Sequence, residues 1–294
     1  MSAIIQLTFD GALVRNQHEV TLRDLAQTMT GLQAAADRAC LDVYRGNVWK
    51  HQRLPRELYP LVEFVVGEPQ DGSYIIEFFS DIGGAIVERI RRAIDEPYNG
   101  AVEEGGQEIY TIGHQIESRK DAANAADELI RYEEMKFSKN RLVTRSYGDK
   151  SINKEIGQML NPVMREKGSY LKLVLKDSNE YVAHTYEFDH DVAKKFKRII
   201  SARKLGHPVI YRGVVRELDK GAETGQKKFR GKFINAENKK TVVIHIEGRE
   251  DFSTLVPYLD KDEPFEIVAS PIIEFDSFDP IGGDIQFLKI YHGG

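Results

Sequence analysis

Three basic residues near the middle of the chain have the spacing of a small anion-binding site. Arg145, Lys150 and Lys154 surround the predicted start of a helix. Free backbone N–H groups and the helix dipole favour an anion at such a start. The same bases could instead pair with nearby acids such as Asp149 or Glu155. The sequence therefore predicts either a phosphate-binding site or a local structural latch in this segment.

The element that positions these bases is a helix beginning near residue 149. Gly148 is expected to break the chain, and Asp149 or Ser151 to cap the new helix through a side-chain oxygen. Pro162 would kink or end the helix, and Gly168 would stop it. Apolar residues recur every three or four positions and should point inward: Ile152, Ile156, Met159, Leu160 and Val163.

A second basic group is predicted on the outer face of a helix over residues 189–203. Asp189 can cap this helix, and its apolar residues recur with helical spacing. The opposite face carries five cations: Lys194, Lys195, Lys197, Arg198 and Arg203. Lysine and arginine predominate between residues 165 and 249, whereas acids predominate from 250 to the end. This asymmetry indicates either an anionic partner or two stretches that neutralise each other in one domain.

A third basic group alternates with phenylalanine on a predicted strand. Lys228 and Arg230 are interleaved with Phe229 and Phe233. Small barrels hold single-stranded nucleic acid in a basic groove with aromatic platforms, and this strand has the residue types for one. Alternation also places the phenylalanines on one side and the bases on the other, as in an ordinary half-buried strand. Both interpretations stay open at this stage.

Patterns typical of catalysis or metal binding are weak. Phosphate-binding motifs such as GxxxxGK[ST] and GxGxxG are missing from the sequence, and its one cysteine, Cys40, lies in an apolar helical pattern. His184 and His190 lie near two aspartates, but Asp189 is better used as a helix cap. Arg45 and His51 have a spacing found in one class of helical ribonucleases. We expect a non-catalytic protein without metal or cofactor, with a hydrolase or nuclease as a third possibility.

Composition is that of an ordinary soluble protein with room for two or three domains. The chain has 294 residues, of which 41% are hydrophobic and 30% charged. Its longest apolar runs fall short of the roughly 18 residues that a membrane span requires. The start has no basic segment followed by an apolar one, so we expect no export signal and a cytoplasmic location.

Residues 1–96 are predicted to form an α+β domain. A strand at 4–9 precedes a helix at 22–43 that Thr21 can cap and Gly46 can end. Strands follow at 61–66 and 73–79, and a second helix starts at Asp81 and ends before Pro97. The first helix has a narrow apolar stripe, which would pack on its own sheet or on a second copy.

Residues 97–168 are predicted to be helical and to connect this domain to a β-rich one. A glycine-rich and acidic stretch at 96–108 marks the first boundary, and one long helix should cover 109–138. Residues 169–294 are expected to form an antiparallel β-barrel-like domain. Its elements are a hairpin at 170–175 and 181–188, the basic helix, strands at 208–218, 228–235, 240–247, 265–271 and 284–291, and a short helix at 251–259. The predicted fold class is α+β.

The N-terminal part resembles uncharacterised bacterial proteins from prophage and defence-type gene neighbourhoods. The resemblance covers about the first ninety residues and rests on LTFDG, His18, LRDLAQTMTGL and GSYIIEF. It implies a role in phage–host conflict, as a sensor, adaptor or counter-defence factor, and it provides no catalytic motif that could be carried over to residues of this chain. We therefore expect a non-enzymatic protein that binds nucleic acid or another phosphate-bearing ligand, as a homo-oligomer. The alternative is a factor that binds or inhibits a protein partner through its helices.

Overall fold

The chain folds into two units that each combine several stretches of sequence. The structure is a computed structural model that describes residues 3–16, 19–46, 48–67, 74–103, 112–125, 129–137, 145–177, 183–221, 229–259, 261–279 and 281–292. Unit 1 comprises Met1–Val48, Gln52–Gln107 and Tyr147–Ser201. Unit 2 comprises Trp49–His51, Glu108–Ser146 and Ala202–Gly294. The α+β class is confirmed, with an N-terminal sheet covered by helices and a C-terminal closed barrel of five strands.

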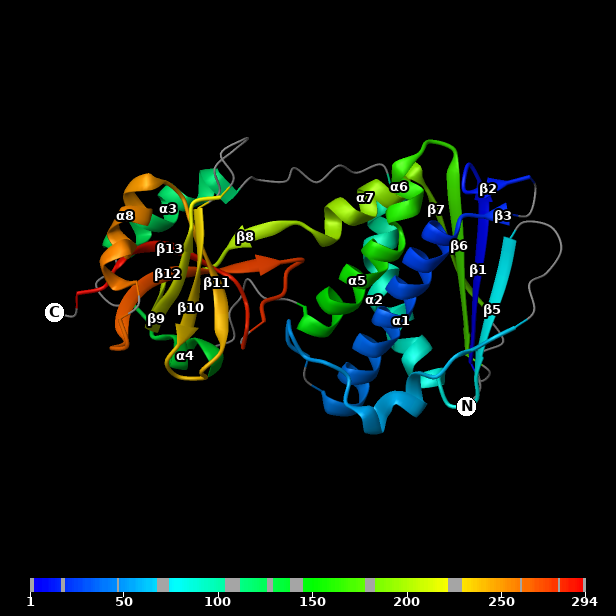
Figure 1. The fold of residues 1–294 in the computed structure, drawn as a ribbon, viewed down its shortest axis with the longest axis horizontal. Helices are drawn as coiled ribbons and strands as arrows, with labels where there is room; N and C mark the ends of the chain where they lie inside the picture. The colour runs from blue at the N-terminus through cyan, green and yellow to red at the C-terminus, as the bar shows by residue number, and fades with distance from the viewer. Residues whose placement is uncertain are drawn as a thin grey trace. The chain divides into compact units, whose positions relative to one another are not determined.

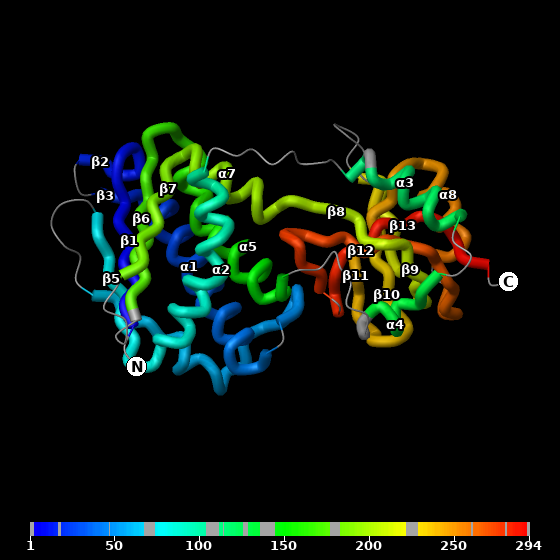
Figure 2. Tube along the Cα trace, turned by 180° about the vertical axis from the view of Figure 1, so that it is seen from behind, coloured from blue at the N-terminus to red at the C-terminus, as the bar shows by residue number. Residues whose placement is uncertain are grey.

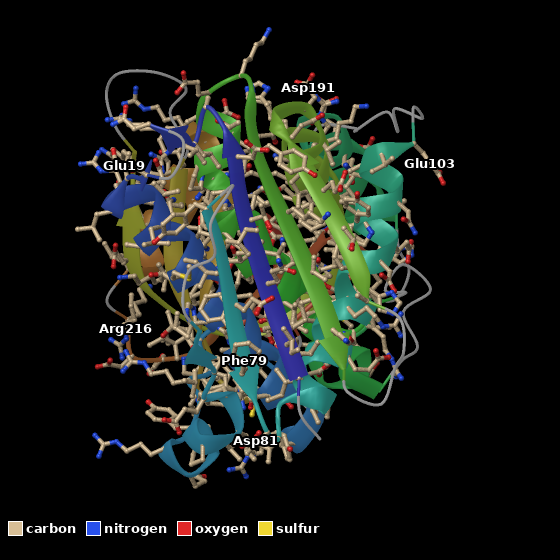
Figure 3. The ribbon with its side chains drawn as sticks, turned by 90° about the vertical axis from the view of Figure 1, so that its right-hand side faces the viewer. Glu19, Phe79, Asp81, Glu103, Asp191 and Arg216 are labelled. Atoms are coloured by element: carbon tan, nitrogen blue, oxygen red, sulfur yellow. The ribbon has the colours of Figure 1, made fainter. Side chains whose placement is uncertain are left out.

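Unit 1 is a five-stranded antiparallel sheet with helices on one face. The strand order is β4-β5-β1-β6-β7, and β1 lies in the centre. The strands are β1 (Ala3–Gly11), β4 (Val65–Val66), β5 (Tyr74–Ser80), β6 (Ser169–Asp177) and β7 (His184–Asp189), and β2 (Val14–Arg15) pairs with β3 (Glu19–Val20). In Figures 1 and 2 the helices α1, α2, α5 and α7 lie on the same side of these strands. Figure 3 looks onto the opposite face, which these helices leave uncovered.

Helix α1 (Leu22–Arg45) begins and ends at the predicted residues. The Thr21 hydroxyl accepts a hydrogen bond from the Asp24 amide, and Gly46 ends the helix in the left-handed conformation, with φ 61°. The middle of the apolar stripe is buried within unit 1, where Leu32 is 5% exposed, whereas Leu22 at its start is 80% exposed and Val43 at its end 39% exposed. Helix α5 and the sheet of unit 1 cover this middle part of the stripe, as the first of the two predicted alternatives requires.

Helix α5 (Tyr147–Met159) starts before Gly148, so the predicted break at this glycine is wrong. A Cβ at Gly148 would lie 2.3 Å from Asp42 Oδ2, and one at Gly31 would lie 2.6 Å from the Met159 backbone nitrogen. Two glycines therefore allow α1 and α5 to approach closely. Asp149 lies in the first turn and pairs with Arg89 on α2. The predicted inward residues are all fully buried, namely Ile152, Ile156, Met159, Leu160 and Val163.

Helix α2 (Gly84–Val102) continues past Pro97, where the sequence predicted its end. Proline cannot donate to the carbonyl four residues earlier, here that of Ala93. The side-chain amide of Asn153 donates to the Ala93 oxygen instead, at 2.6 Å. Asn153 is fully buried and lies on α5. A partner 60 residues away thus satisfies the carbonyl and allows the helix to continue into the predicted linker.

Two further elements of unit 1 differ from the predictions. Residues predicted as a strand at 61–66 form the end of a 3-10 helix, η1 (Arg56–Val62), and the two-residue strand β4. The hairpin β6–β7 and helix α7 (His190–Ile200) were expected in the C-terminal domain. Instead β6 pairs with β1 along its whole length, and α7 packs on α2, α5 and α6 (Asn161–Arg165).

Unit 2 contains a closed barrel. Strands β9, β10, β11, β13 and β12 are bonded in that order, and β12 pairs with β9 to close it. Their bounds are β9 (Val209–Asp219), β10 (Phe229–Asn235), β11 (Thr241–Ile246), β12 (Phe265–Glu274) and β13 (Ile285–Ile290), close to the predicted strands. The first part of β9 pairs with β12 and the second with β10, and the change occurs at Gly213. A short strand, β8 (Arg203–Leu205), extends the sheet beside β12.

The barrel has the strand order of an oligonucleotide/oligosaccharide-binding fold. Its third and fifth strands, β11 and β13, are parallel, and its other contacts are antiparallel. A helix, α8 (Arg249–Leu255), followed by η2 (Val256–Tyr258), connects the third strand to the fourth. This order describes an architecture that carries many binding functions, and it does not by itself assign one.

The single helix predicted over residues 109–138 is wrong. The structure has α3 (Ile112–Ala125) and α4 (Tyr132–Phe137), with Leu129 and Ile130 outside both. Ile210 on β9 donates its amide to the Ile130 oxygen at 3.0 Å, and Arg131 forms a parallel bridge with Ile210. The backbone of β9 therefore takes the hydrogen bond that a continuous helix would need at Ile130. Within the described ranges, helices long and apolar enough to cross a bilayer are absent.

Candidate functional site

The outer face of α7 carries four of the five predicted cations, and all four are exposed. The fifth, Arg203, is not on the helix, because α7 ends at Ile200 and Arg203 lies on β8, where it pairs with Glu274. The Asp189 carboxylate caps this helix by accepting from the amides of Asp191 and Val192 at 2.9 and 2.8 Å. Phe196 and Ile200 are buried on the inner side. The cations, Lys194, Lys195, Lys197 and Arg198, are spaced by one, three and four residues and so share the outer side. We call them the α7 basic face.

Within the part of the chain that the structure describes, no carboxylate forms an ion pair with the α7 basic face. Its single hydrogen-bonding partner there is Asn161, whose side-chain oxygen accepts from Lys197 Nζ at 2.8 Å. Lys197 and Arg198 lie in the last turn, where positive charge also stabilises the helix. Lys194 and Lys195 lie earlier, so the helix dipole does not explain them.

The predicted anion site around Arg145, Lys150 and Lys154 is not assembled as expected. Lys150 is only 7% exposed, and its ammonium donates to the Ile200 carbonyl at the end of α7, at 2.9 Å. It caps a helix end and is not open to a ligand. Lys154 is exposed on α5, whereas Arg145 belongs to unit 2, where its guanidinium lies 4.4 Å above the Phe275 ring.

The basic strand β10 is largely neutralised by its neighbour β9. Arg230 pairs with Asp219 at 3.1 Å, and Lys232 pairs with Glu217 at 2.5 Å. Phe233 is fully buried in the barrel core, and Phe229 packs against that core, so they are not exposed stacking platforms. Lys228 lies outside the described residues. Of the two interpretations of this strand, the ordinary half-buried one is correct.

Several of the candidate catalytic and metal-ligating side chains have other roles in the structure. Burial raises the pKa of the Cys40 thiol to about 11, which leaves it protonated and a poor nucleophile. His190 is buried and its Nδ1 lies 3.0 Å from Asp191, while Asp189 serves as the helix cap. The Arg45 guanidinium pairs with Glu57 at 2.9 Å. Groups of three or more metal-ligating side chains are absent from the described ranges.

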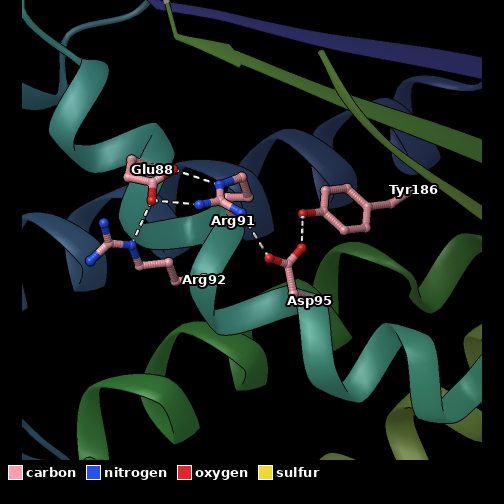
Figure 4. Close-up of polar contacts among 5 residues, drawn as sticks. All are labelled: Glu88, Arg91, Arg92, Asp95 and Tyr186. Carbon is pink, nitrogen blue, oxygen red and sulfur yellow. Dashed lines mark hydrogen bonds and ion pairs between the residues drawn. The ribbon is translucent and has the colours of Figure 1, made fainter. Parts of the chain in front are cut away.

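A charged network connects α2 to β7 in unit 1 (Figure 4). Glu88 accepts hydrogen bonds from Arg91 and from Arg92, each at 2.5 Å. Arg91 also donates to Asp95 at 3.0 Å, and Asp95 accepts from the Tyr186 hydroxyl at 2.5 Å. Burial and the Asp95 carboxylate raise the pKa of Tyr186. Because every group has a partner, the network is structural and not a binding site.

This network gives a pH-dependent prediction. The hydrogen bond from Arg91, helped by Arg92, lowers the pKa of Glu88 from 4.5 to about 2. Because the pKa of Glu88 is lower in the folded than in the unfolded protein, its ionised carboxylate stabilises the fold at any pH above 4.5. This stabilisation is lost as the pH falls from 4.5 to about 2. We expect Glu88→Gln to lose on the order of 1–2 kcal/mol of unfolding free energy at pH 7. Urea denaturation at several pH values should show that the unfolding free energy of the variant falls less steeply between pH 4.5 and 2 than that of the wild type. Parallel plots of unfolding free energy against pH for the two proteins would contradict this expectation.

Sequence reasoning missed a cluster on unit 2 that joins residues far apart in the chain. Lys50 Nζ donates to Asp284 at 2.5 Å, and the Lys50 amide donates to the buried Asp279 at 2.7 Å. Although burial alone would raise the pKa of Asp284, His245 and Lys50 hold it below its usual value. No local pattern could have revealed a contact across 234 residues. Since its charges are paired, we interpret this cluster as structural too.

A pocket of about 290 Å³ on unit 2 has charges of both signs. It lies between the start of α4, β9 and the end of β10, and it includes Arg131, Arg212, Glu237 and Glu266. Arg131 donates to Glu266 at 2.6 Å, which cancels much of its positive charge. The pocket is therefore a weaker candidate for an anion than the α7 basic face.

Comparisons with known proteins returned no match, whether against family models, curated proteins or solved structures. The N-terminal resemblance stays a prediction.

Proposed function

We propose that the protein is a non-enzymatic binding protein that recognises nucleic acid or another phosphate-bearing ligand through the α7 basic face. The observation that carries this proposal is the set of four exposed cations on one side of a well-capped helix, without an ion-paired carboxylate in the described ranges. Of the other predicted cations that the structure describes, Lys150 is buried and Arg230 is paired with an acid, whereas Lys154 is exposed on α5 outside this group.

The spacing of the cations fits a chain of phosphates. Residues three and four apart on a helix lie about 5–6 Å from each other, which is near the separation of successive phosphates along an extended strand. Each lysine or arginine that meets a phosphate releases counterions, and this release provides affinity without a sequence preference. The barrel of unit 2 has an architecture known for binding oligonucleotides, which supports the same ligand class by analogy only. A setting in phage–host conflict depends on the N-terminal resemblance and stays a prediction.

The salt dependence of binding tests this proposal. Fluorescence anisotropy with a labelled single-stranded oligonucleotide of about 20 nucleotides should show binding at 50 mM salt that weakens steeply by about 200 mM. Four phosphate contacts predict a slope of about −3 in the logarithm of the binding constant against that of salt. An absence of binding at low salt to single-stranded DNA, single-stranded RNA and duplex DNA would overturn the proposal.

A further inference from the structure

Strand β4 is a sheet edge whose outward hydrogen-bonding groups are free. Val65 lies opposite Phe79, and the Gly67 amide donates to the Glu77 oxygen at 2.7 Å. In an antiparallel ladder alternate residues bond to the same neighbour, so the N–H and C=O of Val66 point away from β5. The sheet order ends at β4, and no strand in the described part of the chain takes these groups. Such an edge is a template for another strand.

The same edge exposes apolar side chains beside a pocket. Val65 and Val66 are 64% and 60% exposed, and Phe79 is 41% exposed. Figure 3 shows Phe79 on the uncovered face of the sheet. On the helix-facing side a pocket of about 230 Å³ is lined by Ile5, Met29, Leu32, Gln33, Ala36, Phe64, Val66 and Phe78. It exceeds the ~150 Å³ apolar cavity that accepts benzene, so it has room for one apolar side chain.

The stretch of sequence that contains β4 and β5 carries acids only. Residues 58–81 contain no lysine, arginine or histidine and five acids, Glu63, Glu68, Asp71, Glu77 and Asp81. Glu63 is exposed, Glu77 is half-buried, and both share the uncovered face with Val65 because they alternate with Phe64 and Phe78. A partner strand would therefore meet apolar surface on one of its sides and carboxylates on the other.

We propose that β4 docks an extended segment of a partner protein in which apolar residues alternate with lysine or arginine. The segment adds to the sheet through the free groups of Val66, as peptides add to other exposed edges. Its apolar residues opposite Phe64 and Val66 point toward the pocket, and its basic residues lie near Glu63 and Glu77. A second copy of this chain fits less well, because it would bring its own acidic hairpin against this one. This proposal is independent of the α7 basic face.

The test uses a labelled, end-capped heptapeptide that alternates lysine with valine. Two comparison peptides are a block arrangement of the same residues and an analogue with glutamate in place of lysine. We expect the alternating peptide to bind the wild type, and the other two to bind at least about tenfold more weakly. Equal binding of the block peptide, or no binding of the alternating one, would overturn the proposal.

Two protein variants locate the binding. Val66→Pro removes the outward N–H, and an edge strand tolerates proline at such a position, so the melting temperature should hold while affinity falls about tenfold. If this variant unfolds, a double variant, Glu63→Lys with Glu77→Lys, tests the proposal instead. Its matched control changes two other exposed acids in the same way, Glu103→Lys with Glu166→Lys. The first pair should weaken binding and the control should not. Equal effects of both pairs, or a wild-type dimer that Val66→Pro converts to a monomer, would overturn the proposal.

Discussion

Arg89→Met is expected to lower the unfolding free energy by about 2–4 kcal/mol, because it leaves two partly buried carboxylates without their cation. The Arg89 guanidinium donates to Asp42 on α1 at 2.6 Å and to Asp149 on α5 at 2.7 Å. Its side chain is 16% exposed, and both partners raise its pKa against the effect of burial. One side chain of α2 thus connects three helices that cover the sheet of unit 1.

Chemical denaturation of Arg89→Met and of the control Arg92→Met measures this effect. Arg92 lies on the same helix but is 69% exposed, so its loss should change stability by about 0.5 kcal/mol or less. Equal stability of the two variants would show that the contact of Arg89 with α1 and α5 contributes little to the unfolding free energy.

Reversal of the α7 basic face is the second change with a large expected effect. The variant Lys194→Glu, Lys195→Glu, Lys197→Glu and Arg198→Glu should abolish oligonucleotide binding, because four phosphate contacts become four repulsions. All four side chains are exposed, so the fold should survive. Circular dichroism and melting temperature check the fold, and anisotropy at low salt checks the binding.

A matched variant separates a local site from a general charge effect. Four other exposed cations of unit 1, each changed to glutamate, alter the net charge by the same amount, namely Arg23, Arg53, Arg56 and Lys176. This control should retain most of its affinity if phosphates meet α7. If both variants lose binding equally, the interaction is unspecific attraction to the whole protein. If neither loses it, the contact lies on another surface.

Local patterns predicted the elements that local chemistry determines. Thr21 and Gly46 mark the ends of α1 because a hydroxyl cap and a left-handed glycine act within a few residues. The barrel strands were predictable from the alternation of apolar and polar residues along the sequence. Phe233 is buried, as its position in that alternation requires. The cap at Asp189 and the outer position of Lys194 likewise follow from helical spacing.

Long-range partners determine the rest, and a single sequence does not reveal them. The end of α2 was misplaced because Asn153, a residue of another helix, satisfies the carbonyl that Pro97 leaves free. The β6–β7 hairpin was assigned to the barrel because hairpins look alike until pairing with β1 is known. Lys150 looked like a ligand for an anion, but its direction depends on the carbonyl of Ile200 at the end of α7.

Photochemical crosslinking tests the α7 site most directly. A single-stranded oligonucleotide carrying photoreactive uracils is bound to the wild-type protein at low salt and irradiated, and the crosslinked peptides are identified by mass spectrometry. Our account predicts crosslinks within residues 190–201, on α7, and their loss in the variant with the reversed basic face. Crosslinks confined to the barrel strands β10 and β11, and unchanged in that variant, would contradict it.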